Sequence, residues 1–115
     1  MMRVADFVIK FLEEKKISTV FTVSGGGSIF LCDALYKSKR LNYVSCHHEQ
    51  AVSFATESFS RVNNKPGAAI ITTGPGGTNC TTGVACCWID SVPSIFISGQ
   101  VYLNQTIKNT GVRQV

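Results

Sequence analysis

The sequence predicts a three-layer α/β/α domain built on a parallel β-sheet. Short apolar segments alternate with segments of helical periodicity along the 115-residue chain, and the last two apolar segments, 68–73 and 94–98, show no polar alternation. Uninterrupted apolar strands are typical of parallel sheets that helices cover on both faces. The chain is long enough for one domain with a single core and too short for two of ordinary size.

The first half of the chain predicts three helices and two strands. Apolar residues recur at helical spacing in the first and last of these segments, and β-branched and aromatic residues fill the strands. The expected elements are a helix over 3–15, a strand over 19–23, a glycine turn over 24–27, a helix that Ser28 caps and that ends near 37–40, a strand over 42–46, and a helix over 48–62. The last of these is the best periodic match in the chain.

The second half continues the same alternation. The expected elements are a turn over 63–67, a strand over 68–73, a second glycine turn over 74–77, a helix that runs to about Asp90, and a strand over 94–98. Beyond Gly99 the sequence turns polar. Because four strands are few for such a sheet, we expect the last strand to lie at or near an exposed edge.

Composition excludes several classes of function. The formal charge of +4 comes from scattered lysines and arginines without interleaved aromatic residues, so nucleic acid is not an expected partner. The five cysteines include no C-x-x-C pair and predict neither a zinc site nor a disulfide framework. No apolar segment approaches the ~18–20 residues of a membrane helix, and residues 1–16 contain no apolar stretch long enough for a signal peptide. We therefore expect a cytoplasmic protein with no membrane partner.

The unusual residues cluster where strands are expected to end. Ligands of open parallel sheets bind at the carboxyl ends of the strands. Those ends carry residues 24–27, 46–49, 73–77 and 99–100. Glycines there let a ligand approach the backbone closely. A G-x-G-x-x-G fingerprint fails at Phe30 and at Asn79, and no G-K-[ST] motif exists, so dinucleotide and triphosphate sites are not favoured.

Glu49 is the candidate catalytic residue. It lies in the first turn of the expected helix 48–62, where the helix dipole favours its ionised form by roughly 0.3–1 kcal/mol. Two interpretations stay open at this point. Glu49 is either a surface acid that complements the dipole, or a proton-exchanging group whose pKa is raised by burial at the ligand edge.

The residues around Glu49 allow further alternatives. Neighbouring residues on a helix point in different directions, so His47 and His48 do not predict a metal site, and their role stays open. Cys46 beside His47 is an alternative thiol nucleophile, although a cysteine at a strand end is usually part of the core. Asn79 either caps the fourth helix or hydrogen-bonds a ligand.

Three stretches together resemble a known family. They are "VSGGGSIFLCDAL" at 23–35, "HHEQAVSFATESFSRV" at 47–62 and "TTGPGGTNCTTGVACCWIDSVPSIFISGQV" at 72–101. In order and spacing they resemble the N-terminal, pyrimidine-binding domain of thiamine-diphosphate-dependent enzymes of the acetolactate synthase and pyruvate decarboxylase group. The resemblance covers nearly the whole chain.

The resemblance implies roles for five residues. Glu49 matches the glutamate that hydrogen-bonds a ring nitrogen of the cofactor aminopyrimidine and activates the cofactor. Pro75 and Asn79 match positions that line the pyrimidine pocket. Ser24 and Gly25 match the first glycine turn, where many relatives have proline in place of Ser24.

The resemblance also implies an activity and partners. It implies a decarboxylase or carboligase that acts on a 2-oxo acid such as pyruvate, with thiamine diphosphate held between the subunits of a homodimer or tetramer. Mg²⁺ is bound by a diphosphate domain that this chain does not contain. We expect residues 1–115 to be a partial pyrimidine-binding domain, truncated after about four strands and inactive alone. The ending "TGVRQV" resembles the approach to a family loop that continues as G-x-Q-E. The alternatives are a non-catalytic truncated binding or assembly module, and another nucleotide-binding α/β enzyme.

Overall fold

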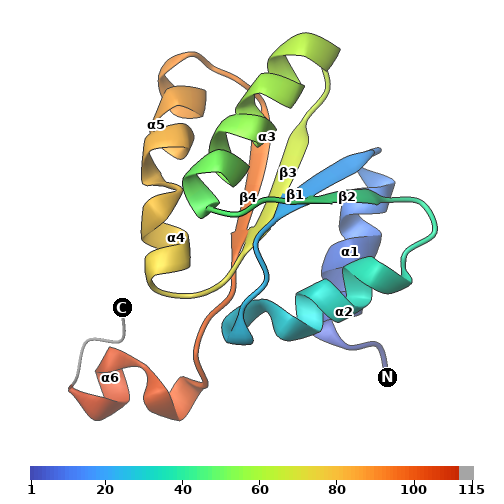
Figure 1. Ribbon diagram of the computed structural model, residues 1–115. Coiled ribbons are helices and arrows are strands. Elements are labelled where there is room, and N and C mark those ends of the chain that lie inside the picture. Colours follow the sequence, from blue (N-terminus) through green and yellow to red (C-terminus); the bar gives the residue numbers. More distant parts are fainter. Residues whose placement is uncertain (112–115) are drawn as a thin grey trace.

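The computed structural model describes residues 1–111 and shows one parallel sheet between two layers of helices (Figure 1). The strands are β1 (Thr19–Thr22), β2 (Asn42–Ser45), β3 (Gly67–Ile71) and β4 (Ser94–Ser98). The helices are α1 (Val4–Glu14), α2 (Ile29–Lys37), α3 (Glu49–Asn63), α4 (Pro75–Asn79), α5 (Thr81–Ile89) and α6 (Ile107–Thr110), with 3₁₀ turns η1 (Gly26–Ser28) and η2 (Leu103–Gln105). The predicted three-layer α/β/α fold is confirmed.

The sheet has the strand order β2-β1-β3-β4, and every neighbouring pair is parallel. In its register, Val20 of β1 lies opposite Tyr43 of β2 and opposite Ala68 of β3. Strand β4 lies at an edge, as the sequence predicted. Helices α1 and α2 cover one face of the sheet, whereas α3, α4 and α5 lie on the other (Figure 1).

Alternate residues of the two central strands build two separate cores. On the α1/α2 face, Val20 packs with side chains of both helices; this core contains Ala5, Ile9, Leu12, Ile17, Val20, Ala34, Leu35, Leu41, Ala68 and Ile70. On the α3 face, Phe21 packs with Val52, Ala69, Ile71 and Cys80. Phe21 also meets Phe59 edge to face, with the ring centroids 5.7 Å apart. The two central strands are therefore fixed from both sides.

Coverage decreases toward the edges of the sheet. All five residues of β3 are buried, whereas β4 is half-buried along most of its length and all of β2 is exposed. Trp88 and Ile89 of α5 keep 85% and 76% of their surface exposed. An apolar groove of about 380 Å³ runs between α5 and β4, lined by Val84, Cys87, Trp88, Val92 and Phe96 among others. Full coverage on both faces thus holds only for the centre of the sheet.

Two expectations about helices are wrong in detail. The helix expected to reach Asp90 without a break is divided at Cys80, where the Cys80 backbone amide bonds to the Gly77 carbonyl in a tighter turn. Ser28 is at the N-cap position of α2, but its side chain makes no cap hydrogen bond. Its hydroxyl donates to the Gly25 carbonyl at 3.2 Å and accepts from the Cys32 thiol at 3.8 Å.

The segment after β4 leaves the body of the domain and forms η2 and α6 (Figure 1). Neither element was expected from its polar sequence. Most of the ending "TGVRQV" lies outside the described residues. Within residues 1–111, no helix combines the length and apolar character needed to cross a membrane.

Candidate functional site

The site lies where the chain changes direction around β1 and β3. After β1 the chain enters α2 on one face of the sheet, and after β3 it enters α4 and α5 on the other face. Two adjacent parallel strands whose connections leave on opposite faces open a crevice at their carboxyl ends. The start of α3 reaches this crevice, and we call the crevice with its surrounding loops the rim.

Glu49 and Asn79 meet at the rim. Glu49 is the first residue of α3, and its Oε2 accepts a hydrogen bond from Nδ2 of Asn79, the last residue of α4, at 3.0 Å. The thiol of Cys80 donates to the Glu49 backbone carbonyl at 3.1 Å. Burial, helped by the charge of Glu49, raises the pKa of this thiol to about 11, so it stays protonated as a donor. Both the side chain and the backbone of Glu49 are thereby held by the end of α4.

The pKa of Glu49 is lowered, whereas burial alone would raise it. The hydrogen bond from Asn79 lowers it below its ordinary value, and the residue's own backbone amide acts in the same direction, as does the charge of His48 when its imidazole is protonated. Burial opposes them but is the weaker influence, because the carboxylate is only half-buried. In the free chain Glu49 is therefore ionised at neutral pH.

Replacing the amide donor should raise the pKa of Glu49. We expect the Asn79→Ala variant to show a higher Glu49 pKa in a ¹³C NMR titration of the side-chain carboxyl, because the largest influence that lowers it is removed. Thr78→Ala, in the same helix, is the control and should leave the value unchanged. An unchanged pKa in Asn79→Ala would contradict the assignment.

The same shift has a consequence for stability. A carboxyl whose folded-state pKa is depressed stabilises the fold above its unfolded-state pKa, and this contribution is lost as the pH falls through the folded-state value. The difference in unfolding free energy between the parent chain and Asn79→Ala should thus be present at neutral pH. The part of this free-energy difference that comes from the ionisation of Glu49 should vanish in acid.

Glycines let two turns of the rim pack closely against Thr72. A Cβ on Gly25 would stand 2.6 Å from the Cβ of Thr72, and one on Gly76 would stand 2.7 Å from the Thr72 Cγ2. The Thr72 hydroxyl oxygen accepts from the backbone amide of Gly27 at 3.1 Å. The first residue after β3 therefore ties the two glycine turns together. Sequence reasoning did not single out Thr72; its place between a buried strand and a glycine turn was the available signal.

Gly76 lies beside the second carboxylate oxygen of Glu49. A Cβ at this position would lie 3.6 Å from Oε1 of Glu49, the oxygen that Asn79 does not contact. Pro75 begins α4 immediately before it and is exposed. The structure thus brings Glu49, Asn79, Pro75 and, through Thr72, Gly25 to one place.

Ser24 is not part of this group. It lines a different pocket of about 210 Å³ on the α2 side of the sheet, together with Thr22, Cys32, Leu35, Tyr36, Tyr43 and Ser45. A further pocket of about 420 Å³ lies on the rim itself, lined by Gly26, Gly27, Ile29, Phe30, Thr73, Gln100, Val101, Tyr102 and Gln105. Within it Gln100 Oε1 accepts from the Thr73 hydroxyl at 3.0 Å and from the Val101 amide at 2.8 Å.

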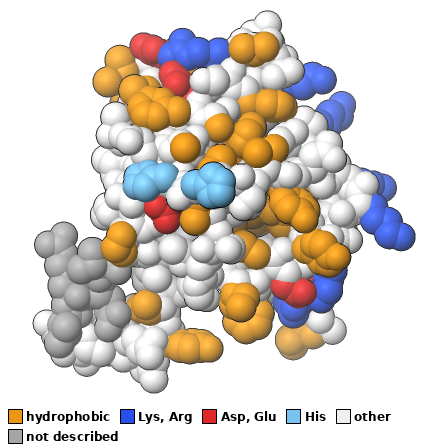
Figure 2. All heavy atoms as spheres, viewed as in Figure 1, with side chains coloured by type: hydrophobic (Ala, Val, Ile, Leu, Met, Phe, Trp, Pro, Cys, Tyr) orange, Lys and Arg blue, Asp and Glu red, His pale blue; other side chains and the backbone are white. Residues whose placement is uncertain are grey.

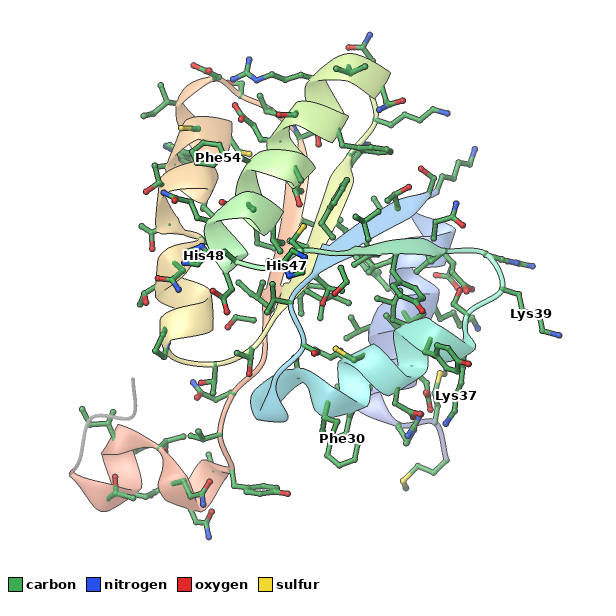
Figure 3. The ribbon with its side chains drawn as sticks, viewed as in Figure 1. Phe30, Lys37, Lys39, His47, His48 and Phe54 are labelled. Carbon is green, nitrogen blue, oxygen red and sulfur yellow. The ribbon has the colours of Figure 1, made fainter. Side chains whose placement is uncertain are left out.

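The two histidines lie at the start of α3 and point to different sides of the chain (Figure 3). Figure 2 shows both on the surface, with an acidic side chain beside them. Nδ1 of His48 accepts from the Gln50 backbone amide at 3.1 Å. Burial raises the pKa of the Cys46 thiol, which is opposite to the activation of a nucleophile. In the part of the chain that the structure describes, no three His, Cys, Asp or Glu side chains are grouped to hold a metal ion.

Residues 2–113 match the family model described as "Thiamine pyrophosphate enzyme, N-terminal TPP binding domain". The chain belongs to this family. It is 42% identical over 97 residues to acetolactate synthase 3, chloroplastic, of Brassica napus, and 42% identical over 97 residues to acetolactate synthase, chloroplastic, of Arabidopsis thaliana. It is 36% identical over 97 residues to acetolactate synthase isozyme 1 large subunit of Escherichia coli. Each match covers 84% of this chain.

This chain of the thiamine pyrophosphate enzyme family spans only a fraction of its relatives' length. It covers 15%, 14% and 17% of the length of the three proteins just named. The resemblance read from the sequence is thereby confirmed at the level of the family and its fold. Since two of these relatives are named as chloroplastic, the expected cytoplasmic location stays a prediction.

Proposed function

We propose that this chain forms the aminopyrimidine side of a thiamine diphosphate site in an enzyme similar to acetolactate synthase. Glu49 is the residue that contacts the ring nitrogen and activates the cofactor. The observation that supports this role most directly is the Glu49–Asn79 hydrogen bond of 3.0 Å at the rim, with Gly76 beside the other carboxylate oxygen. When bound, thiamine diphosphate supplies the carbon nucleophile that attacks a 2-oxo acid such as pyruvate.

The residues at the rim fit a flat heteroaromatic ring. Asn79 occupies one carboxylate oxygen of Glu49, and Gly76, which has no side chain, lies beside the other. A ring in that position excludes water from the carboxylate, and desolvation raises the proton affinity of an acid. Glu49, ionised in the free chain, is then suited to share a proton with a ring nitrogen. Gly25 and Pro75 form the walls, and Ser24 takes part only through the adjoining pocket.

Other parts of the proposed enzyme come from outside this chain. Mg²⁺ and the diphosphate are bound by a separate domain, and two subunits of a homodimer or tetramer enclose the cofactor between them. Residues 1–115, a partial pyrimidine-binding domain, are inactive without that domain. The exposed Trp88 and Ile89 favour, as a second candidate, a non-catalytic module that only assembles with a longer partner.

Calorimetry tests the proposal. The chain is titrated with thiamine diphosphate and Mg²⁺, alone and mixed with the diphosphate-binding domain of an acetolactate synthase. We expect binding in the mixture and a loss of roughly 10- to 150-fold in affinity for Glu49→Gln, since a hydrogen bond to a charged group contributes about 1.5–3 kcal/mol.

Glu57→Gln is the matched control, because Glu57 lies two turns along the same helix and pairs with Arg61 at 2.7 Å. This variant should bind as the parent chain does. Equal affinities for the parent chain and Glu49→Gln would refute the role of Glu49. Association of the mixture without any cofactor binding would instead favour the assembly module.

A further inference from the structure

The helix that carries Glu49 begins with an uncommon cap. His48 has an extended backbone, φ −153° and ψ 143°, and its Nδ1 accepts from the amide of Gln50 at 3.1 Å. This is the N-cap geometry, which Ser, Thr, Asp and Asn usually provide. Of the helices within residues 1–111, α3 alone has a side-chain cap bond.

The direction of this bond fixes the protonation state of His48. A backbone amide is always a donor, so the Nδ1 that accepts from it carries no hydrogen and the ring proton lies on Nε2. An imidazolium has two donors and no acceptor, and its positive charge is unfavourable at a helix N-terminus. A histidine cap therefore exists only while the ring is neutral, unlike a cap from Ser or Asn.

The capped turn is the one that holds Glu49. On its other side, Asn79 and the Cys80 thiol contact the Glu49 side chain and carbonyl. We propose that His48 is a positioning residue whose neutral imidazole orders the first turn of α3, and that its protonation releases this turn and weakens the Glu49–Asn79 contact. The inference deepens the proposed function and rests on it for its relevance to the cofactor; the cap itself does not depend on it.

Few other ionisable groups face His48. The elements packed against α3 are β1, β3, β4, α4 and α5, and none of them carries Asp, Glu, Lys or Arg. Their titratable groups are the thiols of Cys86 and Cys87, with Cys80 at the junction of α4 and α5; Cys46 and His47 precede the cap in the chain. Among residues 1–111, Glu49 is the charged side chain that acts on His48, and it opposes release because it attracts an imidazolium. The first turn of α3 is therefore released only if losing the His48 cap costs more free energy than the attraction between Glu49 and the solvent-exposed imidazolium provides.

NMR of the ¹⁵N-labelled chain without cofactor tests the inference. At pH 8 we expect the imidazole shifts of an Nε2–H tautomer for His48 and a hydrogen-bonded amide shift for Gln50. Between pH 8 and 5.5, where histidine side chains change charge, the Gln50 shift and the Asn79 side-chain amide shift should move together. The open form of the turn should become roughly fivefold more populated, since losing a cap costs about 1 kcal/mol.

Variants separate the cap from the charge. In His48→Asn, the Gln50 amide should show its hydrogen-bonded chemical shift at both pH values, because the asparagine Oδ1 caps the helix and does not titrate. In His48→Gln, the Gln50 amide should show no hydrogen-bonded shift at either pH. His47→Gln is the matched control and should retain the pH dependence of the parent chain. A proton on Nδ1 at pH 8, or the same acid dependence in His48→Asn, would overturn the inference. Because all signals are read without cofactor, failure to bind thiamine diphosphate counts only against the proposed function.

Discussion

The Gly99→Ala variant is expected to lower the free energy of unfolding by about 1–3 kcal/mol or more, as overpacked sites do. A Cβ at this position would overlap with the backbone carbonyl of Gly27 and stand 2.9 Å from the backbone nitrogen of Ser28. Backbone atoms cannot rotate away as a flexible side chain does. The Gly99 amide also donates to the Ile71 carbonyl at 2.8 Å, which fixes the residue after β4 against β3.

Gly26, another glycine of the rim, provides the control, because an alanine side chain at this position would contact no other atom. A Cβ on Gly26 would meet nothing within 4 Å. Gly26→Ala, the same chemical change one residue from Gly27, should stay within about 0.5 kcal/mol of the parent chain. Urea unfolding followed by circular dichroism measures both. Equal losses in the two variants would show that Gly99 does not touch the first glycine turn as described.

The Leu12→Ala variant is expected to cost about 2–5 kcal/mol of unfolding free energy, the range of large-to-small changes in well-packed cores. Leu12 has no exposed surface and lies in the core between α1, α2 and the central strands. Truncation leaves a cavity that the rigid sheet cannot close. Because domains of this size have total stabilities of only 5–15 kcal/mol, the loss is a large part of the whole.

Val4 provides the comparison for Leu12. It begins the same helix and keeps 80% of its surface exposed, so Val4→Ala should change the unfolding free energy by less than about 0.5 kcal/mol. Both variants are measured by urea unfolding at one pH. A loss under about 1 kcal/mol in Leu12→Ala would mean that the α1/α2 core is not packed as described.

Much of the fold is predictable from local sequence. The apolar spacing of 48–62 predicted a helix that the structure places at Glu49–Asn63, and the apolar run 68–73 predicted the strand Gly67–Ile71. Both patterns predict correctly because a helix must bury one face and a central strand must bury both. This requirement determines which neighbouring positions along the chain are apolar. The location of Glu49 at the rim followed from the rule that places ligands at the carboxyl ends of parallel strands.

The remaining features depend on contacts between distant parts of the chain. Sequence reasoning did not predict the break at Cys80, whose thiol contacts Glu49 from 31 residues away. Sequence reasoning also considered only burial and the helix dipole as influences on the pKa of Glu49. It missed the hydrogen bond that lowers this pKa, because the donor, Asn79, lies 30 residues further along the chain. Periodicity shows which face of a helix is buried. It does not show which polar side chain will meet another across two helices.

The strand order of the sheet has a consequence for how quickly the domain forms. Within residues 1–111 no strand pairs with its sequence neighbour through a hairpin, and the central register places Val20 opposite Ala68. The chain must close a long loop before its middle strands gain any contact with each other, and topologies of this kind reach the native state slowly. During synthesis, β1 and β2 therefore emerge before β3, and the edge of β1 that pairs with β3 stays unpaired until the residues of β3 have left the ribosome.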